Sequence, residues 1–111
     1  MQTDPVLDRW VSQARKGYLE MALLRRLKSG ETYGYDLIHA LKQSAGFEAL
    51  AEGTVYPVLA RMKKDALVTA EWRTEESGTP RKYYRITQRG LAALDQMQSI
   101  WIGMTEALDT L

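Results

Sequence analysis

The stretch EGTVYPVLARMKKDALVTAEWRTEESGTPRKYYRIT, residues 52–87, decides the fold because the spacing of its apolar residues changes halfway along. In the first half they recur every three or four positions, which predicts a helix that follows turn and cap residues at 52–54 and ends near Asp65. Pro57 is expected in the first turn of this helix, where a missing N–H is tolerated. The predicted buried stripe consists of Val55, Val58, Leu59 and Met62.

The second half of the stretch alternates apolar and polar residues, which is typical of β-strands. The polar residues 75–80 predict a hairpin turn between two strands. Since consecutive side chains point to opposite faces, only one of Tyr83 and Tyr84 can face outward. The residues expected on the apolar faces are Val68, Ala70 and Trp72 in the first strand, and Tyr84 and Ile86 in the second.

Helical patterns flank this stretch on both sides. Thr3-Asp4-Pro5 is a helix start, and one or two helices are expected from there to about Lys28, with Gly17 marking either a break or a close approach. A second short helix is predicted over residues 33–44. After the strands, Thr87 is expected to cap a final helix over residues 88–110.

The order helix, helix, helix, strand, strand is that of a winged helix-turn-helix. We therefore expect a mainly α fold with a two-stranded wing: a DNA-binding domain over residues 1–87, followed by a C-terminal dimerisation helix over residues 88–111. In such a domain the third helix enters the DNA major groove, and the wing lies along the backbone or minor groove. Some winged helices bind only proteins, so the fold alone does not fix the partner.

The charge distribution favours a polyanionic partner. The net charge of the 111 residues is only +1, but residues 54–90 carry eight Lys and Arg against four Asp and Glu, whereas residues 91–111 carry none against three. This basic block coincides with the predicted third helix and wing, so it can present a positive face at short range. The alternative is an ordinary solvated surface.

Several classes of function are disfavoured by what the sequence lacks. It has no cysteine and a single histidine, His39, which stands three residues from Asp36 without any serine motif or phosphate loop to complete a catalytic site. No enzyme activity, metal or cofactor is expected. No apolar run reaches the ~18 residues of a membrane span, and the start lacks signal-peptide features, so a cytoplasmic protein without membrane contact is expected.

The final helix carries the most regular apolar spacing in the chain. Its steps of 3, 4, 3, 4 and 3 residues are those of a coiled-coil seam. This spacing predicts a homodimer in which the first and last helices of two subunits interlock, with Trp10 and Tyr18 contributed by the first helix. A two-fold dimer matches a palindromic operator. Packing of this helix on its own domain is the alternative. The predicted dimerisation residues are Leu94, Met97, Trp101, Met104, Leu108 and Leu111.

Trp101 lies in the middle of this seam, between Met97 and Met104. Two symmetry-related indoles are hard to close-pack and methionine is adaptable, so the dimer centre can hold a cleft for a planar aromatic molecule. Trp10 is included in this predicted ligand site. The alternative is that Trp101 is ordinary interface core.

The motifs of the chain resemble those of PadR-family transcriptional regulators. The matching segments are Tyr-Gly-Tyr-Asp-Leu at 33–37, Glu-Gly-Thr-Val-Tyr-Pro-Val-Leu at 52–59 with Arg-Met at 61–62, and Gly-Thr-Pro-Arg-Lys-Tyr-Tyr-Arg-Ile-Thr at 78–87 with Gly90. The single C-terminal helix resembles the short subgroup of the family, which dimerises through it; some members are multidrug-binding repressors with a tryptophan pair in a central pore. The chain departs from the family at Ala66, where glycine is frequent.

The resemblance assigns DNA contact to residues of the third helix and the wing, and the first helix adds one further candidate. Tyr56 is suited to donate to a phosphate, Lys16 to reach one from the first helix, and Arg61 either to clamp a phosphate or to pair with an acid such as Glu48. The sequence therefore predicts a repressor that a small hydrophobic ligand releases; the alternatives are a protein-interaction module and a DNA-binding regulator without a ligand. The assigned residues are Lys16, Thr54, Tyr56, Pro57, Arg61, Lys63, Lys64, Arg81 and Lys82.

Overall fold

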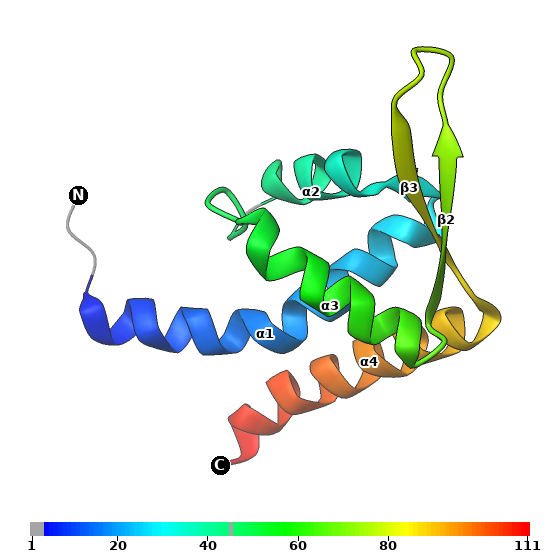
Figure 1. The fold of residues 1–111 in the computed structure, drawn as a ribbon. Coiled ribbons are helices and arrows are strands. Elements are labelled where there is room, and N and C mark those ends of the chain that lie inside the picture. Colours follow the sequence, from blue (N-terminus) through cyan, green and yellow to red (C-terminus); the bar gives the residue numbers. More distant parts are fainter. Residues whose placement is uncertain (1–3, 45) are drawn as a thin grey trace.

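The computed structural model describes residues 4–44 and 46–111. Helices α1, α2 and α3 form a body from which the β2–β3 hairpin projects, while α4 runs along the base of this body (Figure 1). This confirms the mainly helical winged fold. The elements are α1 (Pro5–Lys28), β1 (Thr32–Tyr33), α2 (Gly34–Lys42), α3 (Glu52–Lys64), β2 (Val68–Thr74), β3 (Pro80–Ile86), α4 (Gln88–Ala107) and the 3₁₀ turn η1 (Leu108–Thr110).

The wing belongs to a three-stranded antiparallel sheet with the order β1-β3-β2, rather than standing as two strands alone. The additional strand, β1, pairs Thr32 with Tyr84 and Tyr33 with Tyr83. Tyr84 is buried and Tyr83 is only partly buried, so Tyr84 is the tyrosine that faces the core. The two residues of β1 were predicted as loop and helix because a two-residue strand has no periodicity to detect.

Helix α1 is a single helix of 24 residues, the first of the two predicted alternatives, and Gly17 marks neither a break nor a close approach, since nothing lies within 4 Å of a Cβ atom placed there. The carboxylate of Asp4 caps it by accepting a hydrogen bond of 2.8 Å from the backbone N–H of Val6, with Pro5 as the first helical residue. Thr3, the other predicted start residue, lies outside the described residues. The N-terminal half of α1 extends beyond α2 and α3 (Figure 1).

Helix α3 begins three residues earlier than a cap at Thr54 would place it, because its N-cap is Ala51. Glu52 and Gly53 are helical, and Pro57 therefore lies in the second turn rather than the first. The carbonyl that loses its partner is that of Gly53, an exposed residue that water can reach, which explains why the helix continues through the proline. After α3, Ala66 adopts a left-handed φ of 62°, the conformation that favours the glycine frequent in the family.

Helix α4 starts where the sequence predicts. The Thr87 hydroxyl accepts a 2.9 Å hydrogen bond from the N–H of Gly90 and donates one of 2.6 Å to the carbonyl of Ala66. Leu94 is only 1% exposed and belongs to the core of the chain itself, so the apolar seam open to a second chain begins after it. None of the helices in the described ranges is long and apolar enough to cross a membrane.

The candidate nucleic-acid interface

Helix α3 turns one face to the core and one to the surface. Val55, Leu59 and Met62 are fully buried, whereas the opposite side of the helix is exposed. Six of the nine residues assigned to DNA contact lie on this exposed side, so the structure brings the α3 part of the predicted interface together on one helix face. They are Thr54, Tyr56, Pro57, Arg61, Lys63 and Lys64.

A hollow of about 560 Å³, here called the wing groove, separates α3 from the hairpin. Lys63 stands on its α3 wall and Lys82 on its β3 wall, and none of its lining residues is acidic. The Lys82 ammonium lies 5.8 Å from the centre of the Trp72 ring and 5.9 Å from that of Tyr84. The wing groove is lined by Tyr56, Leu59, Ala60, Lys63, Trp72, Lys82 and Tyr84.

A second hollow, of about 460 Å³, continues from the wing groove towards the start of α2 and contains Arg81. The Arg81 guanidinium lies 4.4 Å from the centre of the Tyr33 ring. A Cβ atom on Gly34 would come within 2.7 Å of the Tyr56 hydroxyl, so the glycine allows Tyr56 to lie against α2. Burial, followed by the charge of Glu52, raises the pKa of Tyr56, which keeps its hydroxyl protonated as a donor.

Of the two roles predicted for Arg61, a phosphate clamp or an ion pair, the structure shows an ion pair, but its partner is not the predicted Glu48. Its guanidinium lies 3.3 Å from the carboxylate of Glu20 on α1, while Glu48 accepts a hydrogen bond from the backbone N–H of Gly46. Glu20 could not be foreseen because it is 41 positions away in the chain and only the packing of α1 against α3 places it there. Arg61 is thereby held at the edge of the exposed α3 face.

Part of the basic block is neutralised within the sheet. The carboxylate of Glu31 accepts hydrogen bonds from Arg73, at 2.7 and 3.0 Å, and from Arg85, at 2.9 Å. These bonds lower the pKa of Glu31 to about 2. Lys63 and Lys82 carry no ion pair in the described part of the chain, so both charges of the wing groove are available to a partner.

Lys16 lies apart from the wing groove, beside the start of α3. It lines a hollow of about 250 Å³ together with Arg15 and Thr54. Sequence reasoning missed Arg15, and it also missed Trp72, which was assigned to an apolar strand face but is 66% exposed. The cross-strand pairing of Trp72 with Lys82 places it beyond the edge of the core, which the alternation of residues does not reveal.

Aromatic side chains connect α4 to the segment before α3. The Tyr18 ring centre is 5.5 Å from that of Phe47 and 5.5 Å from that of Trp101. Trp101 and Tyr18 line a hollow of about 540 Å³ between α1 and α4. Of the predicted ligand residues only Trp101 lines it: Met97 packs against the core, whereas Met104 and Trp10 are exposed elsewhere.

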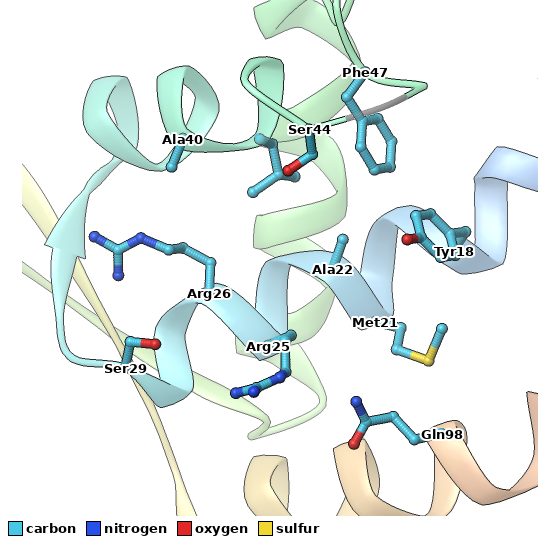
Figure 2. A pocket seen from close by; sticks show the side chains of 11 residues that line it. Tyr18, Met21, Ala22, Arg25, Arg26, Ser29, Ala40, Ser44, Phe47 and Gln98 are labelled. Atoms are coloured by element: carbon cyan, nitrogen blue, oxygen red, sulfur yellow. The ribbon is translucent and has the colours of Figure 1, made fainter.

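An adjoining cavity of about 410 Å³ lies between α1, α2 and α4. Figure 2 shows Arg26 at the end of this cavity near Ala40, with Tyr18 and Phe47 at the other end. It shares Tyr18, Met21 and Gln98 with the hollow beside Trp101. The two hollows therefore form one depression along α1, which the sequence did not predict because it arises from the packing of three separate helices.

Comparison with known proteins gives a consistent result. Residues 23–96 match the model of the transcriptional regulator PadR-like family. The chain is 30% identical over 96 residues to a protein of Lysinibacillus sphaericus described as uncharacterized protein X, covering 85% of this chain and 87% of that protein. These matches include α2, α3 and the wing.

Solved structures agree with the family match. A PadR-like transcriptional regulator from Bacillus cereus is 35% identical, with a TM-score of 0.75 over 88% of this chain and 94% of that one. A PadR family transcriptional regulator from Eggerthella lenta is 29% identical, with a TM-score of 0.82 over 95% and 90%. These proteins are transcriptional regulators and not enzymes. This chain, whose exposed α3 face and wing carry the family's motifs, belongs to the PadR-like family of DNA-binding transcriptional regulators.

Proposed function

We propose that this protein is a homodimeric transcriptional repressor that binds a palindromic double-stranded DNA operator in the cytoplasm and is released by a small planar aromatic molecule. The observation that carries the DNA-binding part is the continuous surface made by the exposed face of α3 and the wing groove, with lysines on both walls. The proposed DNA contacts are Lys16, Thr54, Tyr56, Pro57, Arg61, Lys63, Lys64, Arg81 and Lys82.

Replacing Lys63 and Lys64 by alanine tests this surface. Both side chains are exposed at the end of α3, so the fold should be unaffected. If each neutralises one phosphate, the variant binds every duplex more weakly, and the slope of log affinity against log salt concentration falls by about one to two units. Fluorescence anisotropy with labelled duplex DNA over a range of salt concentrations measures both quantities.

Lys28→Ala is the matched control, because Lys28 is an exposed lysine of α1 outside α3 and the wing. It should change neither affinity nor slope. An unchanged slope in the Lys63 and Lys64 variant would remove these residues from the interface.

The dimer part of the proposal rests on apolar side chains that the single chain leaves uncovered. Met104 on α4 is 57% exposed, Leu108 at the start of η1 is 65% exposed, and Trp10 is 65% exposed on the projecting half of α1. Exposed apolar surface of this kind marks an interaction site. A two-fold partner would present two α3 helices to two half-sites of an operator.

Ligand release needs a path from the ligand to α3. The contacts of Tyr18 with both Trp101 and Phe47 provide one, because Phe47 lies in the segment that leads into α3. A ligand beside Trp101 would release DNA only if it bound the DNA-free arrangement more tightly than the DNA-bound one.

A fluorescence titration tests the ligand. In a variant with Trp10→Phe and Trp72→Phe, Trp101 is the sole remaining emitter among the three tryptophans. We expect saturable quenching by planar cationic or phenolic compounds, and at least about tenfold weaker binding after Trp101→Ala, since an aromatic face is lost. Unchanged ligand affinity in a Trp101→Ala protein that is still dimeric would contradict the proposed pocket.

A further inference from the structure

Trp72 occupies a position that core packing does not explain. Val68 and Tyr84 on the inward face of the hairpin are buried, but Trp72 and its partner Lys82, two register positions beyond the Ala70–Tyr84 pair, have left the core. The indole is 66% exposed and is absent from the hydrophobic cluster of the fold. A large apolar ring held at the mouth of a groove is available to a partner.

The lining of the wing groove combines two charged side chains with apolar and aromatic ones. Lys63 supplies an ammonium group from α3 and Lys82 one from β3, and the same groove is lined by the Trp72 ring and by the buried side chains of Leu59 and Tyr84. The Lys82 ammonium is 5.8 Å from the Trp72 ring centre, so an anion held by Lys82 would place its neighbouring group over the indole. A nucleic-acid backbone has this composition, because phosphates alternate with sugars whose carbon faces are apolar.

The position of the groove favours a duplex. It is lined on one side by α3, the helix suited to a major groove, and on the other by the hairpin. With α3 in the major groove, the strand that borders that groove would pass between α3 and the hairpin.

We propose that the wing groove holds one sugar-phosphate strand of duplex DNA, with Trp72 packed against a deoxyribose and Lys63 and Lys82 on the flanking phosphates. This inference rests on the proposed DNA-binding surface and adds Trp72 to it. Because the contact is with the backbone, it contributes affinity for any sequence. Because the indole is uncharged, it releases no counterions, so its contribution is independent of salt.

The test compares how the DNA affinity of each variant depends on salt concentration. A mixed-sequence duplex is sufficient, because a backbone contact does not depend on the base sequence. Trp72→Ala should weaken binding about three- to thirtyfold, as expected for uncovering part of an aromatic ring, and leave the slope against log salt unchanged. Trp72→Phe should restore most of the affinity. Lys82→Ala should instead reduce the slope by about 0.9.

Ile100→Ala is the control, since Ile100 is 58% exposed on α4 and belongs neither to the proposed DNA surface nor to the proposed dimer seam. It should bind DNA like the wild type. In a protein with Trp10→Phe and Trp101→Phe, the emission of Trp72 should shift to shorter wavelength and become protected from iodide when duplex is added.

Three results would overturn the inference. If Trp72→Ala binds as the wild type does while the Lys63 and Lys64 variant is weakened, the DNA surface stands and Trp72 is not part of it. If Trp72→Ala weakens binding to single-stranded DNA but not to duplex DNA, the groove holds bases rather than a duplex backbone. If the wild type binds no duplex at any salt concentration, the proposed function itself fails.

Discussion

Gly90→Ala should lower the free energy of unfolding by about 3 kcal/mol, the largest stability effect expected from adding one methyl group to this chain. A Cβ atom at Gly90 would lie 2.1 Å from the backbone carbonyl oxygen of Leu67 and 2.7 Å from Ile86. The same carbonyl accepts a 3.0 Å hydrogen bond from the N–H of Thr87. The backbone cannot yield there without breaking the bond that joins the start of α4 to the start of the wing.

Thermal and urea unfolding measure this effect. A loss of that size corresponds to a fall in melting temperature of roughly 10–20 °C for a domain of this length. Gly103→Ala is the matched control, because the same substitution in the same helix places the Cβ atom where nothing lies within 4 Å. It should raise stability by up to about 1 kcal/mol, since glycine disfavours a helix interior.

The comparison must be made at one protein concentration, because the proposed dimer would contribute to apparent stability. If Gly90→Ala and Gly103→Ala have the same effect, the close approach of α4 to Leu67 does not constrain the fold.

The order of elements could be predicted because local patterns determine it. The three- and four-residue spacing before Asp65 and the alternation after Val68 are properties of short segments, as are the caps at Asp4 and Thr87. Strand β1 left no such pattern, since two residues cannot show a period.

The site could be predicted only in part, for the same reason. Local spacing places Tyr56, Lys63 and Lys64 together on an exposed helix face, and the structure agrees. Exposure of Trp72 depends on where the core ends along the hairpin, and the partner of Arg61 depends on how α1 crosses α3. Both are properties of tertiary packing, which residue spacing does not encode.

Met104→Glu combined with Leu108→Glu should convert the protein to a monomer and weaken operator binding by about a hundredfold or more. Both side chains are exposed in the single chain and both belong to the proposed seam, so carboxylates there would be desolvated in a dimer without disturbing the core. A monomer engages one half-site and loses the gain from holding two binding modules together, which is typically 10²–10⁴ in affinity. Sedimentation velocity distinguishes 12.6 kDa from twice that mass.

Ala92→Glu combined with Gln96→Glu is the matched control. These residues are also exposed, also four positions apart on α4, and add the same charge away from the seam. This variant should remain dimeric and bind the operator with little loss, which separates the effect of position from that of added negative charge. A Met104 and Leu108 variant that stays dimeric would show that α4 packs elsewhere, whereas a monomeric variant with unchanged operator affinity would show that one half-site suffices and that the palindrome is not required.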